Sequence, residues 1–243
     1  MEFSDTTNKD GIIELIEDLT GTQSSSSSSY TLAKKTRDVN NAFAKYMMLA
    51  ISSAGRWQVD DTNQADYPII YTNVTSGQND YSFTNDGSTP ANQILDITRV
   101  EIKDTSGNWR QLQPIDQDDL NGVALDEFME TDGEPQYYDK RANGIFLYPA
   151  TNYTQTDSLK IYYNRMPVYF LTTDTTKKPG IPDMFHEYLA IRPAYTYAHS
   201  KGLSNKVDLR NEMLSMEEDI KEYYRDRNKD EKLRLRTAYR NPR

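Results

Sequence analysis

Residues 208–227 read DLRNEMLSMEEDIKEYYRDR, and this stretch defines the last element of the fold. Its apolar residues recur at spacings of three and four, which places them on one face of an α-helix. They are Leu209, Met213, Met216, Ile220 and Tyr223. We therefore expect a long C-terminal helix that packs this face against a hydrophobic core.

A cationic tail follows this helix. Residues 221–243 contain nine basic and four acidic residues, a net charge of +5. Because the whole chain has a formal net charge of −9, the remaining residues carry −14. A positive end on a negative body indicates an arm that binds another surface. The alternative is a solvated, frayed C-terminus, since chain ends are commonly poorly ordered.

Helical spacing of apolar residues predicts three more helices upstream. They cover residues 9–19, 31–54 and 183–201. The first ends before Gly21 and the third before Gly202, and glycine is a common residue just past a helix end. Asp183 is the expected N-cap of the third helix, which Pro193 should kink. Six consecutive serines, residues 24–29, predict a flexible loop between the first two helices.

Between the second and third helices, the pattern changes to one typical of strands. The expected strands cover residues 67–74, 78–83, 94–103, 109–112, 143–150 and 157–165. The third and fourth form the strongest hairpin, through a turn at residues 104–108, and Pro114 ends it. The last two strands are expected to pair antiparallel with each other. Residues 116–128 are compatible with a short acidic helix.

Strands flanked by helices at both ends predict an α+β fold. In this fold N- and C-terminal helices form a helical bundle, with an inserted antiparallel β-sheet or small β-sandwich and a long C-terminal helix with an extended tail. The expected domains are a helical domain of residues 1–56 and 180–228, a β-rich insertion of residues 57–179, and a cationic C-terminal tail of residues 229–243.

The chain lacks the common signatures of catalysis. It has no cysteine, which excludes disulfides, thiolate zinc sites and cysteine nucleophiles. It has no GxSxG elbow, no phosphate-binding loop, no GxGxxG and no HExxH motif. Its two histidines, His186 and His199, would lie on different turns of one helix, so a shared metal site is not expected. We expect no catalytic residue, no cofactor and no metal.

Two other functions fit parts of the sequence. The acidic residues between 116 and 130 are dense enough to supply the two carboxylates of a cell-wall glycan hydrolase, with Asp118 and Glu127 as examples. Tyrosines in the expected strands suit a glycan-binding tail component, although strand tyrosines more often pack or form interfaces. They are Tyr137, Tyr138, Tyr162 and Tyr163.

Charge and hydropathy also bear on partners. The negative net charge argues against a general nucleic-acid binder, since such affinity comes from Lys and Arg on phosphates. An arm that binds DNA directly remains an alternative, with an affinity that falls steeply with salt. The longest apolar run, residues 47–51, is far shorter than the roughly 20 residues that cross a bilayer, so no membrane segment is expected.

Five segments in a fixed order carry a resemblance to a known family. They read RVEIKDTSGNWRQLQPID (99–116), GEPQYYD (133–139), NGIFLYPA (143–150), LKIYYNRMP (159–167) and PGIPDMFHEYL (179–189). Over roughly residues 81–197, the chain resembles the head-to-tail adaptor proteins of tailed bacteriophages.

The resemblance implies a structural protein of the virion neck, assembled in the host cytoplasm. It implies a homo-oligomeric ring, expected to be a dodecamer, that lies beneath the portal protein and binds a downstream tail protein. DNA would pass through the ring without specific binding, because an acidic body offers phosphates few cations. Aromatic and arginine side chains usually dominate interfaces. The predicted portal contacts are Tyr223, Tyr224, Arg227, Leu233, Leu235, Arg236 and Tyr239.

Overall fold

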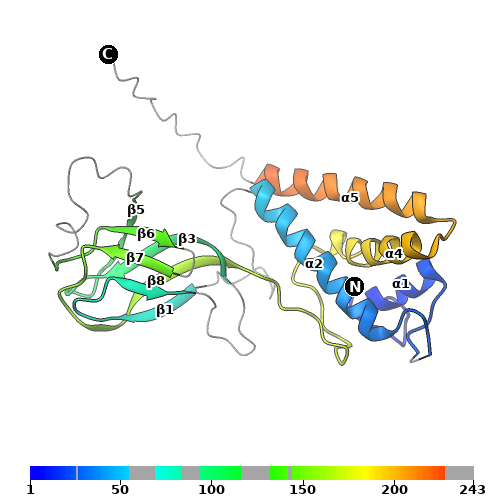
Figure 1. Ribbon diagram of the computed structural model, residues 1–243, viewed down its shortest axis with the longest axis horizontal. Coiled ribbons are helices and arrows are strands. Elements are labelled where there is room, and N and C mark those ends of the chain that lie inside the picture. Colours follow the sequence, from blue (N-terminus) through cyan, green and yellow to red (C-terminus); the bar gives the residue numbers. More distant parts are fainter. Residues whose placement is uncertain (26, 55–68, 84–93, 116–131, 142–143, 228–243) are drawn as a thin grey trace, which may run out of the picture.

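A computed structural model describes residues 1–25, 27–54, 69–83, 94–115, 132–141 and 144–227. Within these residues the chain is a mixed α and β protein with four α-helices and two four-stranded sheets (Figure 1). The helices come from both ends of the sequence and gather at one end of the molecule, whereas the strands lie at the other end. This arrangement agrees with the predicted α+β class.

The four predicted helices are all present. They are α1 (Ile12–Thr20), α2 (Leu32–Ala54), α4 (Tyr188–Lys201) and α5 (Lys206–Arg227). Gly21 and Gly202 end α1 and α4 in the left-handed conformation, with φ of 65° and 67°, as expected of glycine at this position. The N-cap prediction for Asp183 was wrong. Asp183 opens a short 3-10 turn, η2 (Asp183–Phe185), and α4 begins after Glu187.

One hydrophobic core holds the helices together. α5 packs along α2 and α4, and α4 contacts all three other helices. Large rings fill the centre, where Tyr46 of α2 lies 6.0 to 6.2 Å from the rings of Phe185, Tyr188 and Tyr224. Phe170, from the connection between the strands and α4, enters the same core. The helical region is therefore completed by a segment that is not helical.

The serine tract connects α1 and α2, and it is anchored near both ends. The Ser24 hydroxyl accepts a hydrogen bond from the fully buried ammonium of Lys35, which also pairs with Glu17 at 3.0 Å. The Ser29 hydroxyl lies 2.6 Å from the hydroxyl of Tyr197 on α4. This part of the predicted loop thus contributes contacts to the helical region.

The strands form two sheets in which most neighbouring strands run antiparallel. They are β1 (Ile69–Val74), β2 (Asp80–Ser82), β3 (Ile94–Lys103), β4 (Trp109–Gln111), β5 (Gln113–Pro114), β6 (Tyr137–Arg141), β7 (Gly144–Tyr148) and β8 (Gln155–Arg165). One sheet has the order β1-β8-β3-β4 and the other β2-β7-β6-β5. Both sheets contribute to a second core, with Val100 and Ile161 from the first and Ile145 and Leu147 from the second. The inserted strands are therefore a β-sandwich.

The hairpin of β3 and β4 is confirmed, with Glu101 opposite Gln111 and a turn held by the Asp104 carboxylate, which accepts the Ser106 and Asn108 N–H groups. The predicted pairing of the last two strands was wrong. β7 lies between β2 and β6, whereas β8 lies between β1 and β3 in the opposite sheet. Both strands face the shared core, so their apolar patterns look alike although they never pair.

Two further expectations concern the ends of elements. Pro114 does not end the extended structure, because it belongs to β5, which pairs in parallel with Tyr138 of β6. Pro193 stays inside α4 and is buried.

The expected acidic helix at residues 116–128 and the tail at residues 229–243 lie outside the described residues.

Candidate assembly surfaces

The C-terminal helix carries the first three of the predicted portal contacts. Tyr224 is only 2% exposed, and its hydroxyl lies 3.0 Å from that of Tyr46. Tyr223 is half-buried, with its ring edge-on to Phe185 at 5.4 Å. Arg227 is the last residue of α5. Leu233, Leu235, Arg236 and Tyr239 lie outside the described residues.

The predicted portal contacts on α5 therefore differ in their exposure. The burial of Tyr224 in the core of its own chain argues against a contact with another protein in this conformation. A period of three to four residues marks the buried face of a helix, and Tyr224 lies on that face with Ile220. Contact of all seven residues with a portal stays a prediction.

A polar network fixes α5 against α4. Glu217 of α5 pairs with Arg192 at 2.9 Å and accepts a hydrogen bond from the Tyr188 hydroxyl at 2.9 Å. Burial raises the pKa of Tyr188 well above its usual value, so this hydroxyl stays protonated and donates. Charge-assisted hydrogen bonds of this kind have defined geometry. The hydrophobic core and this polar network thus fix the orientation of α5 together.

The sandwich presents an aromatic and charged surface on its β1-β8-β3-β4 sheet. In the centre of this sheet, Lys160 lies opposite Tyr71 on one side and Glu101 on the other. Its ammonium pairs with Glu101 at 3.2 Å and lies 4.0 Å from the centroid of the Trp109 ring. Tyr71 and Trp109 are 51% and 37% exposed. We call Tyr71, Glu101, Trp109 and Lys160 the sheet cluster, and exposed aromatic rings of this kind are frequent in protein interfaces.

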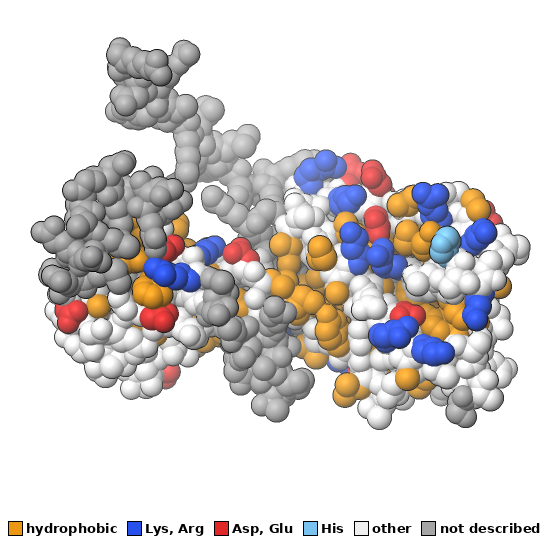
Figure 2. All heavy atoms as spheres, in the orientation of Figure 1, with side chains coloured by type: hydrophobic (Ala, Val, Ile, Leu, Met, Phe, Trp, Pro, Cys, Tyr) orange, Lys and Arg blue, Asp and Glu red, His pale blue; other side chains and the backbone are white. Residues whose placement is uncertain are grey.

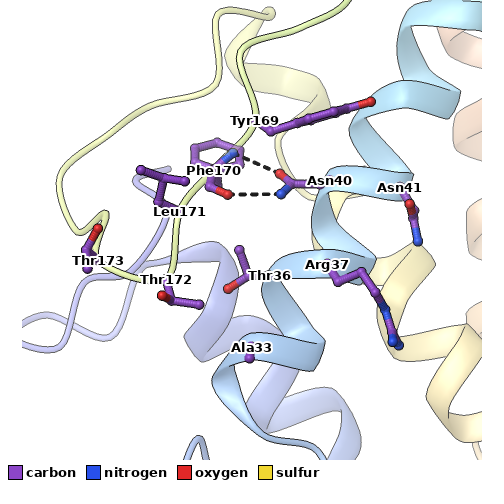
Figure 3. Close-up of a pocket in the computed structure, with 10 residues that line it drawn as sticks. All are labelled: Ala33, Thr36, Arg37, Asn40, Asn41, Tyr169, Phe170, Leu171, Thr172 and Thr173. Atoms are coloured by element: carbon purple, nitrogen blue, oxygen red, sulfur yellow. Dashed lines mark hydrogen bonds between the residues drawn. The ribbon is translucent and has the colours of Figure 1, made fainter. Parts of the chain in front are cut away.

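A shallow groove of about 600 Å³ lies between α2 and residues 169–173 (Figure 3). The Asn40 side chain bridges it, because its amide donates to the Phe170 carbonyl and its carbonyl accepts the Phe170 N–H, both at 2.9 Å. The ring of Phe170 is buried, whereas Tyr169 and Leu171 are 41% and 63% exposed. Arg37 is the only charged residue among those that line the groove. Such a lining suits contact with a protein better than acid–base chemistry.

The buried histidine, His186, has a structural role. The His186 ring is bonded on both sides, with Nε2 3.0 Å from the Ile181 carbonyl and Nδ1 2.8 Å from the amino group of Met1. Burial lowers its pKa, which keeps the ring neutral. His199, in contrast, is exposed at the far end of α4. The two histidines therefore do not form a common site.

Among the described residues there is no group of three or more His, Asp or Glu side chains placed to hold a metal ion. The same part of the chain has no helix that is long and apolar enough to cross a membrane. Asp118 and Glu127, weighed above as hydrolase acids, lie outside it.

Comparison with known proteins agrees with this reading. A model of the SU10 adaptor protein family matches residues 34–238, which span α2, both sheets, α4 and α5. The chain belongs to the SU10 adaptor protein family. It is therefore a bacteriophage adaptor-type structural protein, as its resemblance to phage adaptors implied, and the match extends beyond the segments that carried that resemblance. No curated protein matches this SU10 adaptor.

Proposed function

We propose that this SU10 adaptor joins the phage head to its tail. Copies of the chain form a ring beneath the portal protein, DNA passes through the ring, and the far side of the ring binds a downstream tail protein. The observation that carries this proposal is the firmly held helix α5, which leads directly into a cationic segment on an otherwise acidic chain. The family match supplies the virion setting.

The charge of the C-terminal segment supports an arm that binds the portal. Residues 228–243 contain six basic and two acidic residues, a net charge of +4. Leucine, tyrosine and arginine alternate within them, and such residues act as interface anchors. The proposed contacts are Tyr223, Arg227, Leu233, Leu235, Arg236 and Tyr239. Tyr224 is left out, because its ring supports the core of its own chain.

A rigid base makes such an arm effective. The Arg192–Glu217 pair and the buried face of α5 hold the last described helix in one direction. A base that is already held loses little conformational freedom when the protein binds a partner, and a smaller entropic cost leaves more net affinity. The acidic remainder of the chain would repel DNA phosphates from the wall of the ring.

The division into domains is part of the same proposal. We assign residues 1–56 and 180–228 to a helical domain and residues 57–179 to the β-rich insertion. The two hydrophobic cores share no residue, which supports two domains, although Phe170, within the range of the insertion, belongs to the helical core. The helical domain carries the arm, so we assign portal binding to it and leave the sandwich for contact with other neck or tail components.

A truncation that ends the chain at Asn228 tests the proposal. We expect the truncated protein to keep its far-UV circular dichroism and its melting temperature but to lose co-sedimentation with portal-bearing particles. A matched control keeps the length and composition of residues 229–243 and scrambles their order. Weakened binding of the control indicates specific anchors, and full binding indicates attraction by charge alone. Unimpaired binding of the truncated protein would exclude the arm.

A further inference from the structure

The outward face of α5 has no partner in the described part of the chain, and its charges are segregated. Acidic residues occupy one flank of the helix, at positions that share a face when 3.6 residues make a turn. They are Asp208, Glu212, Asp219 and Glu222, all exposed. Ser215 occupies the remaining position of this stripe. We call these residues the acidic flank.

The other flank is basic. Its members are Lys206, Arg210, Lys221 and Arg225, of which three are exposed and Lys221 is half-buried. Val207 and Leu214, which are 56% and 43% exposed, lie on the basic side of the helix, and Asn211 and Glu218 lie between the two flanks. On the opposite side, the stripe that contains Leu209, Met213 and Ile220 is buried. The core-facing stripe thus separates an acidic flank from a basic flank.

These charges are almost unused within the chain. Among the described residues, the only ion pair that either flank makes is Lys221 with Glu218, at 3.9 Å. The pair that anchors α5, Arg192–Glu217, involves neither flank. Blue and red side chains are visible along the exposed edge that α5 forms (Figure 2). Both flanks are therefore available to another molecule.

The positions of the charges along α5 indicate which kind of partner fits the two flanks. Each flank has one pair of charges in the first half of α5 and one pair in the second half. Two parallel α5 helices without a stagger place Asp208 and Glu212 of one within two residues along the axis of Arg210 of the other, about 3 Å at 1.5 Å per residue. Asp219 and Glu222 meet Lys221 in the same way. A second copy of this chain therefore matches the first.

We propose that the acidic flank of α5 in one copy binds the basic flank of α5 in the next copy. The contact joins two different surfaces of the same chain, so it is heterologous, which is the type of contact that builds a ring when its rotation closes. Val207 and Leu214 lie next to the contact and add apolar area. Each exposed ion pair contributes little alone, whereas several in one interface make the association steeply dependent on salt. This proposal rests on the ring of the proposed function and identifies the surface that builds it.

Charge reversal with complementation tests the contact in the full-length protein. One variant reverses the acidic flank by Glu212→Lys with Asp219→Lys, and the other reverses the basic flank by Arg210→Glu with Arg225→Glu. We expect each variant alone to associate at least ten-fold more weakly than the wild type in low salt, measured by sedimentation velocity. An equimolar mixture of the two regains association, because each reversed flank then meets a flank of opposite charge in the other variant.

A control reverses charges on α4 instead, by Glu187→Lys with Lys201→Glu, both exposed residues, and is expected to associate as the wild type does. If the wild type is monomeric in solution, the same comparison uses cooperativity of binding to portal-bearing particles, which each single variant should lose and the mixture should regain. Wild-type behaviour of both variants, or a mixture that stays as weak as its components, overturns the proposal.

The outcome is separable from that of the truncation. Self-association that shows complementation without any binding to portal particles retains the α5 contact and rejects the head-to-tail function. Binding to portal particles that is non-cooperative and insensitive to both reversals retains the arm and rejects the α5 contact. Loss of portal binding by only one reversal, with no rescue in the mixture, assigns that flank to the portal and also rejects contact between copies.

Discussion

The helical region and the β-sandwich differ in where their aromatic side chains lie. In the helical region the rings lie inside, where Phe3 stacks on Phe170 at 4.6 Å and Tyr46 contacts three other rings. In the sandwich most of the core is aliphatic, and Tyr71 and Trp109 lie on the outer face beside Lys160. Aromatic rings are thus prominent in the helical core, whereas in the sandwich some rings, such as Tyr81 and Phe83, are buried and others lie on the outer face.

The spacing of the elements explains this difference. Two sheets pack about 10 Å apart, and branched aliphatic side chains fill that even layer well. Four helices and an irregular connection leave wider, uneven gaps, which large rings fill with more buried area per residue. The richness of the chain in tyrosine, 18 residues, is therefore not evidence for an interface until each ring has been placed.

The largest expected effect comes from the ring that completes the helical core. Phe170→Ala should destabilise the helical region by about 3–5 kcal/mol, because it removes a buried ring and leaves a cavity between Phe3 and Phe43. Denaturant unfolding followed by circular dichroism at the helical band measures the change. The neighbouring Leu171→Ala, at a residue 63% exposed, should change stability by about 0.5 kcal/mol or less. Similar effects of the two variants would contradict the assigned packing.

The matching change in the sandwich is Ile161→Ala, in the central strand β8. Ile161 is fully buried, and its truncation should cost about 2–5 kcal/mol. Hydrogen exchange read by mass spectrometry should show faster exchange in peptides from β1, β3 and β8 and no change in those from α2 and α5. Thr156→Ala, at an exposed position of β8, is the control. Faster exchange in both regions would show that they unfold as one unit and would reject the two-domain division.

A smaller effect is expected where a polar side chain holds the connection between the two regions. Asn40→Ala removes both hydrogen bonds to the Phe170 backbone and should destabilise the helical region by about 1–3 kcal/mol. Asn41→Ala, at an exposed residue beside the same groove, should leave the unfolding midpoint unchanged within error. If the two variants unfold alike, the Asn40 bridge does not hold the connection.

The pH dependence of the helical region should come partly from His186. Burial lowers its pKa in the folded chain, so at acidic pH the unfolded chain binds the proton first. The stabilisation is full above about pH 6.5, the ordinary value for histidine, and is lost as the pH falls through the lowered folded pKa. His186→Gln should flatten this fall between pH 7 and 5 in urea titrations, and His199→Gln should keep the wild-type slope. A wild-type slope in His186→Gln would assign the dependence to other groups.

The smallest effect is expected on the outer face of the sandwich. Trp109→Ala should cost the fold only about 1 kcal/mol, because the ring is partly exposed and its contact with Lys160 lies at the surface. A thermal melt of the variant beside wild type measures it. A loss as large as that for Ile161→Ala would mean that the sheet cluster is a structural element and would remove the contrast between the two regions.

Much of this fold follows from local pattern. Leu209, Met213 and Ile220 predicted the buried face of α5, and Gly21 and Gly202 predicted where two helices end. The Asp104 turn identified the β3–β4 hairpin correctly. Each of these signals comes from residues that are close together in the sequence. It therefore does not depend on contacts with distant parts of the chain.

The features that were missed depend on contacts between distant residues. Nothing near Phe170 indicates that a connection would enter the helical core, and the Asn40 bridge spans 130 positions of sequence. Lys35 reads as a surface lysine until Glu17 and Ser24 are placed beside it. The sheet cluster needs the register of three strands before Tyr71, Lys160 and Glu101 become neighbours. The burial of Tyr224 likewise depends on Tyr46, which is 178 positions away in the sequence.

Periodicity, glycine positions and charge were enough to establish the four helices, most of the strands, the mixed fold class and the cationic end, because helices and turns form from neighbouring residues and charge adds up along the chain. Packing over long distances settled which strands pair, which tyrosines are buried, and how the connection before α4 is held. A strand with one apolar face suits either sheet of a sandwich, and a ring that suits a core also suits an interface. Those choices are made by the partners that the complete fold brings into contact.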